Sequence, residues 1–301
     1  MKKLIAIFGV LAFTAGMAFS QHNTATTEQE GTNLEALIEQ VGGEWNTATQ
    51  EQFGLNNVVE IEQSGNHNMA SQWQDSRETG AYDPDNQAFI NQSGDHNIAG
   101  QIQGSNSQRN EAFIDQSGDW NEAYQNQENQ GLLADIDQSG NSNWASQTQA
   151  NNADRAVIDQ SGDHNVATQD QDGKRNIAEI DQSGDWNEAT QDQFAYQDHP
   201  LDAELYIIQE GSNNTAYQLQ NNEETGSYAI ITQEGDYNQA SQYQYGPGVN
   251  DASITQHGDW NQATMMQTGE NLIGTIIQHS SNNIATMTQV GFENTATIIQ
   301  N

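Results

Sequence analysis

Polar and apolar residues alternate with a period of two over short segments along most of the chain. Segment 110–116, for example, reads Asn-Glu-Ala-Phe-Ile-Asp-Gln, so that Asn, Ala, Ile and Gln share one face while Glu, Phe and Asp share the other. A period of two indicates a β-strand, because successive side chains of a strand point to opposite faces. Turn residues follow each segment and no 3.6-residue period is present, which argues against helices.

These segments belong to a repeat of about 22 residues that occurs eleven times between Gln40 and Gln300. Each repeat has two halves, and each half holds a cluster of Ser, Gly, Asp and Asn followed by an alternating segment. A repeat this short cannot bury a core alone, so neighbouring repeats must stack. We therefore predict an all-β fold: a parallel β-solenoid of about eleven two-strand coils, with two packed parallel sheets and coils about 4.8 Å apart.

The same residue types recur at the same inward position from repeat to repeat. An alanine column runs through Ala99, Ala123, Ala145, Ala167 and Ala189, an isoleucine column through Ile90, Ile114, Ile136, Ile158 and Ile180, and a glutamine column on the facing sheet through Gln101, Gln125, Gln147, Gln169 and Gln191. Burying an unpaired amide costs about 1–3 kcal/mol. We therefore expect stacked Gln and Asn side chains to hydrogen-bond to the copies above and below, as in cross-β amide ladders.

Three further columns surround one turn of the coil, and together they form the candidate structural ladder. The glutamines are Gln63, Gln92, Gln116, Gln138, Gln160, Gln182, Gln209, Gln233, Gln256 and Gln278. The glycines are Gly65, Gly94, Gly118, Gly140, Gly162, Gly184, Gly211, Gly235 and Gly258. The asparagines are Asn68, Asn97, Asn121, Asn143, Asn165, Asn187, Asn214, Asn238, Asn261 and Asn283. A positive φ at a corner explains the glycines; a phosphate-binding loop is the alternative, but neither Gly-Lys-Ser/Thr nor a helix follows.

Insertions interrupt the repeat at five places, all in the alternate turn and hence on one edge of the solenoid. They lie between Gln74 and Asn86, Gln103 and Asn110, Gln193 and Gln209, Gln220 and Gln233, and Gln244 and Gln256. The three prolines, Pro84, Pro200 and Pro247, all fall in them. Proline donates no backbone hydrogen bond, so this edge is expected to tolerate change.

The first 20 residues differ from the rest of the chain. Lys2 and Lys3 precede an apolar run from Leu4 to Phe19, and Ala18-Phe19-Ser20 offers a cleavage site. This pattern predicts a secretory signal peptide over 1–20, with a membrane anchor as the alternative. We assign 21–39 as an N-terminal segment of degenerate half-repeats and 40–301 as the repeat solenoid.

Composition limits the partners and the chemistry. The formal net charge is −35 and there is no cysteine, so we expect no nucleic-acid partner, no disulfide scaffold and no thiol enzyme. An acidic chain with few apolar residues is typical of disorder, but disorder does not require regular spacing. Every candidate catalytic residue is repeated and lies at an edge, and we predict no enzyme activity, no cofactor and no metal.

Two edge columns have more than one interpretation. His67, His96 and His164 share a turn position with Trp120, Trp186, Tyr237 and Trp260, and form either a variable aromatic edge or, at His67 and His96, a metal site. Rows of acids are Asp115, Asp137, Asp159 and Asp181, and at the turn Asp95, Asp119, Asp163 and Asp185. Unit charges 4.8 Å apart repel by about 0.9 kcal/mol even in water, so these rows either solubilise the surface or regulate assembly through pH or divalent cations.

The repeat phase continues nearly to both ends, at 23–29 and 294–300, without a capping element. Soluble solenoids need caps, and an uncapped parallel stack presents strand edges to another molecule. The ends therefore predict self-assembly.

The pattern Ile-x-Gln-x-Gly-x-x-Asn-x-Ala, seen at 90–99 and 254–263, resembles the curlin repeat of bacterial curli. The resemblance implies an extracellular functional-amyloid subunit that is secreted through an outer-membrane pore, nucleated by a minor curlin subunit and deposited as biofilm-matrix fibres on a Gram-negative cell. Uniform acidic repeats favour the major fibre subunit over the minor, nucleating one. A monomeric solenoid adhesin or ice-binding protein would need a flat Thr-x-Thr face along many coils, and Thr-Ala-Thr occurs only at isolated places.

Overall fold

The computed structural model describes residues 22–76, 85–104, 107–195, 203–222 and 226–301. These residues form 24 β-strands, and none of them belongs to a helix long and apolar enough to cross a membrane. The predicted signal peptide, Pro84 and Pro200 lie outside the described residues. By their internal contacts the chain divides into two units, 1–142 and 143–301, and each is described separately.

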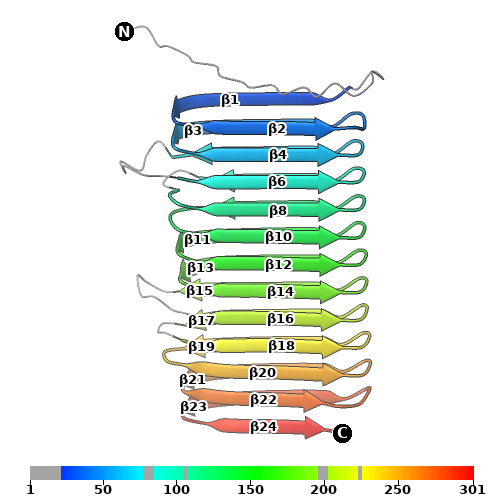
Figure 1. Cartoon of the computed structure of the whole chain (residues 1–301). Helices are drawn as coiled ribbons and strands as arrows, with labels where there is room; N and C mark the ends of the chain where they lie inside the picture. The colour runs from blue at the N-terminus through cyan, green and yellow to red at the C-terminus, as the bar shows by residue number, and fades with distance from the viewer. Residues whose placement is uncertain (1–21, 77–84, 105–106, 196–202, 223–225) are drawn as a thin grey trace. The chain divides into compact units, whose positions relative to one another are not determined.

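The first unit contains ten strands in two parallel sheets. Their bounds are β1 Thr24–Thr32, β2 Glu35–Val41, β3 Thr47–Leu55, β4 Val58–Ser64, β5 Met69–Asp75, β6 Gln87–Ser93, β7 Ile98–Gln103, β8 Glu111–Ser117, β9 Glu122–Gln127 and β10 Leu133–Ser139. The odd strands follow one another in one sheet and the even strands in the other (Figure 1). Each odd–even pair of strands is one coil.

The second unit repeats this arrangement with fourteen strands. Their bounds are β11 Trp144–Asn152, β12 Arg155–Ser161, β13 Val166–Lys174, β14 Ile177–Ser183, β15 Glu188–Ala195, β16 Glu204–Glu210, β17 Thr215–Asn222, β18 Tyr228–Glu234, β19 Gln239–Gly246, β20 Asn250–His257, β21 Gln262–Glu270, β22 Leu272–Gln278, β23 Ile284–Phe292 and β24 Thr295–Gln300. Its odd and even strands again form two separate parallel sheets. The predicted parallel β-solenoid is confirmed in both units.

Coils pair in register, so that each repeat position meets its own copy. Ile158 lies opposite Ile180, and Ile180 lies opposite Ile207. The predicted inward face is also correct: along β8, Ala112, Ile114 and Gln116 are buried while Glu111 and Asp115 are exposed. The coil formed by β1 and β2, in the segment assigned to degenerate half-repeats, pairs residue for residue with β3 and β4.

The corner glycines are required for two reasons. All nine predicted corner glycines have positive φ, from 90° at Gly258 to 114° at Gly211, a region where a side chain is strained. They also stack closely, since a Cβ added to Gly184 would lie 2.1 Å from the carbonyl oxygen of Gly211. Any side chain at this corner would separate adjacent coils.

One break in the glutamine column is matched by a change on the facing sheet. Met265 replaces a column glutamine and is fully buried, while Gly274 stands where most coils have alanine. A Cβ at Gly274 would lie 2.6 Å from Met265 Sδ. The glycine therefore provides the space that the longer thioether needs.

All five insertions lie in links from an odd strand to the next even strand, as expected for one edge. This edge is not merely a loop, however. Ser76, at the start of one insertion, is buried, and its Oγ accepts a hydrogen bond from the backbone of Leu55 at 3.1 Å. The beginning of that insertion is thus part of the packed coil.

Candidate assembly site: amide ladders and coil corners

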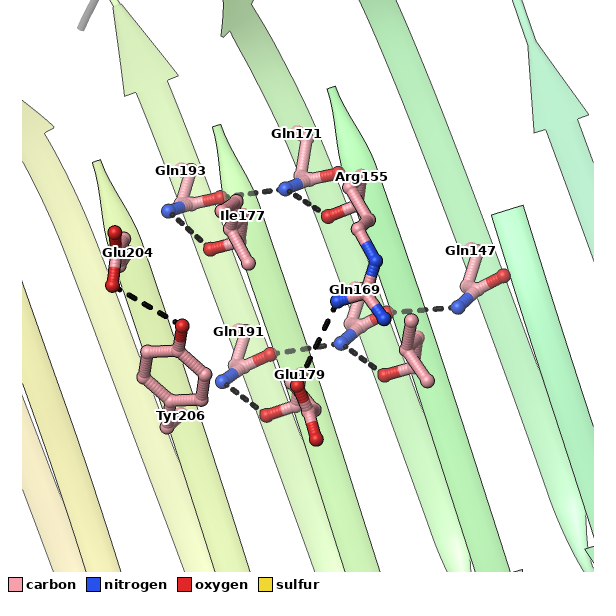
Figure 2. Close-up of polar contacts among 11 residues, drawn as sticks. Gln147, Arg155, Gln169, Gln171, Ile177, Glu179, Gln191, Gln193, Glu204 and Tyr206 are labelled. Carbon is pink, nitrogen blue, oxygen red and sulfur yellow. Dashed lines mark hydrogen bonds and ion pairs between the residues drawn. The ribbon is translucent and has the colours of Figure 1, made fainter. Parts of the chain in front are cut away.

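Glutamine ladders run through the interior of each unit. In the second unit, Gln147 Nε2 donates to Gln169 Oε1 at 2.9 Å and Gln169 Nε2 to Gln191 Oε1 at 2.9 Å (Figure 2). A parallel ladder joins Gln171 Nε2 to Gln193 Oε1 at 2.8 Å. Each amide thus bonds to its copy in the next coil, as the predicted cross-β-like ladder requires.

The same glutamines tie the two sheets together. Gln169 Nε2 also donates to the backbone carbonyl of Val157 at 2.9 Å, and Gln191 Nε2 to that of Glu179 at 3.0 Å. A backbone carbonyl can only accept, so the group facing it must be the NH₂ of the amide. The orientation of each amide, and hence the direction of the ladder, is therefore fixed by chemistry.

The predicted glutamine column of the even strands forms a third ladder. Its ten predicted members are all at most 1% exposed. Gln160 Nε2 donates to Gln182 Oε1 at 2.8 Å, and Gln182 Nε2 to Gln209 Oε1 at 2.8 Å and to the carbonyl of Val166 at 3.1 Å. In each of these steps the donor lies in the earlier coil, so the ladder is polar along the chain direction.

The asparagine column makes different bonds from those expected. Asn165 Oδ1 accepts from the backbone N–H of Asn187 at 3.0 Å, and Asn165 Nδ2 donates to the backbone carbonyl of Gly184 at 2.8 Å. The side chain therefore bonds to the backbone of the next coil rather than to the next asparagine side chain. It satisfies two corner groups that point along the solenoid, where no sheet hydrogen bond can reach them.

The turn aspartates belong to the same corner, a role that the sequence interpretation missed. Asp185 Oδ1 accepts the backbone N–H of Asp163 at 2.9 Å, and Asp119 Oδ1 accepts that of Asp95 at 2.8 Å. Asn141 does the same for Asp119 at 3.0 Å, which shows that the acceptor oxygen matters here and the charge does not. These residues are not only a solubilising row.

The histidines and tryptophans of the edge column stack on one another. His67 and His96 are parallel with ring centroids 4.7 Å apart, and His96 lies 4.0 Å from Trp120. Two parallel imidazoles hold their nitrogen lone pairs side by side in the ring planes, rather than converging on one point. The geometry is that of the aromatic edge, and among the described residues no group of three or more potential ligands gathers around it.

The corner at the insertion edge is less regular. Asp154 occupies an asparagine position in the second unit, and its Oδ1 accepts the backbone N–H of Asn176 at 2.8 Å. Asp154 Oδ2 and both side-chain polar atoms of Asn176 are buried without a hydrogen-bond partner. Burial raises the pKa of Asp154 to about 8, because a carboxylate there would lose its hydration.

The outward acids are partly buried along the sheets. The pKa of Asp181 is raised, first by burial and then by the charges of Asp159, Glu179 and Glu210. The pKa of Asp170 is also raised, by burial and then by Asp192 and Asp172. Loss of solvent is thus the main cause of these raised pKa values, and repulsion between stacked acids is the second. Arg155, 3.7 Å from Glu179, offsets some of the negative charge (Figure 2).

The last described coil exposes what the interior coils bury. Among the described strands, β23 pairs only with β21 and β24 only with β22. Gln300 Oε1 accepts from Gln278 at 2.8 Å and its Nε2 donates to Ile284 O at 2.9 Å, which leaves one N–H without a described acceptor. At the first described coil, Gln40 Nε2 donates to Gln63 Oε1 at 2.9 Å and to Thr24 O at 3.2 Å, and its own Oε1 has no described donor.

Comparison with known families supports this interpretation of the repeats. Residues 151–184, 173–217 and 250–279 match the sequence model of the curlin associated repeat. These segments include ladder residues from three predicted columns. No curated protein sequence matches the chain.

Proposed function

This chain belongs to the curlin associated repeat family, and from that premise we propose that it is the major subunit of an extracellular, curli-like functional amyloid. It is exported through an outer-membrane pore, is nucleated by a minor curlin subunit and forms biofilm-matrix fibres on a Gram-negative cell. Its role is structural, and the ladder residues act by joining coils within and between copies.

One observation carries the proposal: the ladders are polar, and the first and last described coils offer complementary groups. The last coil offers an N–H of Gln300, and the first coil offers Oε1 of Gln40. Continuing the register places Gln300 of one copy next to Gln40 of another, because both occupy the same repeat position on an even strand. A donor then meets an acceptor, whereas two like ends would present donor to donor or acceptor to acceptor.

The terminal strands add backbone pairing to this contact. Parallel strands whose edges are unpaired template the addition of another strand. Exposed apolar side chains on the last coil, among them Ile284 and Val290 at 68% each, would be covered in part by the next copy. The same physics that stacks coils within a unit thus stacks copies.

Purified residues 21–301 should assemble without cofactor into unbranched fibres with a meridional spacing of about 4.8 Å. Electron microscopy and fibre diffraction measure this directly. A folded monomer that stays dispersed at high concentration would show that the ends do not template each other.

The docking contact has a matched pair of variants. Gln300→Glu removes the N–H donor and places a carboxylate opposite Gln40 Oε1, so seeded elongation should slow severalfold. Asn301→Asp adds the same charge one residue later, outside the column, and should elongate nearly as the unmodified chain does. Equal elongation rates for both variants would contradict the proposed register.

A further inference from the structure

Two pairs of tyrosines each lie across neighbouring coils, one pair on each sheet. Tyr206 on β16 and Tyr228 on β18 have ring centroids 5.7 Å apart, and Tyr217 on β17 and Tyr243 on β19 have centroids 5.5 Å apart. β16 and β18 are neighbours in one sheet and belong to successive coils, and β17 and β19 are neighbours in the other sheet and also belong to successive coils. We propose that these pairs are two sites of oxidative tyrosine–tyrosine coupling, through which a peroxidase-type oxidant using hydrogen peroxide joins neighbouring coils covalently.

The ring geometry favours coupling over simple stacking. The planes are tilted by 41° in one pair and 47° in the other, so the rings are not stacked face to face. Coupling joins ring carbons adjacent to the phenol carbon, so it needs edges in contact. The parallel rings of the edge column, such as Tyr237 on Trp260 at 5°, present faces instead.

Register explains why the rings meet at an angle. Tyr206 lies opposite Ile230 and Tyr228 opposite Glu204, so the two tyrosines are diagonal neighbours on the same outward face. Tyr217 and Tyr243 have the same relation, since they lie opposite Ser241 and Leu219. Diagonal side chains two residues apart remain within reach of each other when they are aromatic.

In each pair, one phenol is hydrogen-bonded to a carboxylate. Tyr206 Oη donates to Glu204 Oε2 at 3.1 Å (Figure 2), and Tyr217 Oη donates to Asp192 Oδ2 at 2.9 Å. Burial first, and then these acids, raise the pKa of Tyr206 to about 12 and that of Tyr217 further. Both phenols therefore stay protonated. When either phenol loses an electron, its proton is transferred to the hydrogen-bonded carboxylate, Glu204 or Asp192.

The reaction balances with one peroxide for each link. Each ring loses one electron and its phenolic proton, the two phenoxyl radicals join through a carbon–carbon bond, and the two displaced ring hydrogens return to the phenol oxygens. Hydrogen peroxide takes up two electrons and two protons and becomes two molecules of water. The oxidant can reach the rings, since Tyr228 is 37% exposed and the other three are half-buried.

The chain provides its own controls. Tyr124 donates to Glu122 Oε1 at 2.7 Å, yet no aromatic ring contacts it among the described residues. It therefore has a carboxylate to accept its proton but no second ring to couple with.

Cleavage after glutamate places the four paired tyrosines in separate fragments, 205–210, 211–223, 225–234 and 235–270. Fragments 205–210, 211–223 and 225–234 each contain one tyrosine, whereas 235–270 also contains Tyr237 and Tyr245, so the Tyr243→Phe variant is needed to assign its link.

The test treats folded chain with peroxidase and hydrogen peroxide, then maps the glutamate-specific digest by mass spectrometry. We expect links between 205–210 and 225–234 and between 211–223 and 235–270. Tyr228→Phe should abolish the first link alone and Tyr243→Phe the second alone, because phenylalanine keeps the ring but cannot form the phenoxyl radical. In a mixture of isotope-labelled and unlabelled chains, each link should join fragments of the same label.

Three results would overturn the proposal. They are oxidation without these two links, equal yields of the links in urea-unfolded chain, and links that join labelled to unlabelled chains. Coupling at Tyr124 as frequent as at the pairs would also count against it, since carboxylate contact alone would then be sufficient.

Discussion

At the residue scale, Asp154 shows how one substitution in a column changes the chemistry of the interior. An asparagine at this corner bonds to the next coil without charge, as Asn110 does when its Oδ1 accepts the backbone N–H of Leu132 at 3.0 Å. Asp154 keeps the same acceptor contact with Asn176 but adds an oxygen that is buried and has no partner. Such a group is stable only when it is protonated.

Asp154 therefore makes stability depend on pH. Its folded pKa of about 8 lies above the ordinary value of 3.8, so the folded state binds more protons than the unfolded state between these two values. The stabilisation is fully present below about pH 4 and is lost as pH rises toward 8. Asp154→Asn should reduce the pH dependence of the denaturation midpoint between pH 5 and pH 8. Asp159→Asn, on the outward face, should change this pH dependence much less.

At the element scale, each strand is held by its two sheet neighbours and by glutamines that bond along and across the coil. Gln182 contacts three partners in this way: Gln160, Gln209 and the carbonyl of Val166. The alternation of the sequence indicated that this residue points inward. It did not indicate the second bond to the facing sheet, because that requires the corner to bring β13 and β14 together.

Gln182→Leu should weaken the packed coil, and so slow assembly, more than an outward substitution of the same kind. It leaves Gln160 Nε2, Gln209 Oε1 and Val166 O each without one buried partner, at about 1–3 kcal/mol for each group that finds no replacement. Thr168→Leu, on the outward face of β13, is the matched control. Thioflavin kinetics at equal concentration compare the two, and a slower Thr168→Leu would show that the glutamine ladder is not what limits assembly.

At the scale of the whole molecule, charge opposes assembly. The formal net charge is −35, and an arriving copy meets a fibre end of the same sign. Partial burial raises the pKa values of Asp170, Asp181, Asp192 and Asp251. These carboxyls therefore take up protons at a higher pH than an exposed aspartate does, and protonation favours the folded state as pH falls.

Assembly should consequently have a shorter lag at pH 4.5 than at pH 7, and millimolar calcium at pH 7 should act in the same direction by screening and bridging carboxylates. Thioflavin fluorescence at fixed protein concentration and constant ionic strength measures the lag. Identical lag times under all conditions would mean that repulsion between copies does not control the rate.

The sequence by itself determined the coil. Period-two alternation indicated strands, the repeat length required stacking, and the fixed phase of Ala, Ile and Gln identified the inward columns. What needed the tertiary structure was every contact whose partner is backbone or lies off the column. The asparagines bond to the corner of the next coil, the turn aspartates accept backbone N–H groups, and Tyr206 meets Tyr228 diagonally. Repeats of unequal length separate such partners by different intervals in the sequence, and only the folded corner brings them to one place.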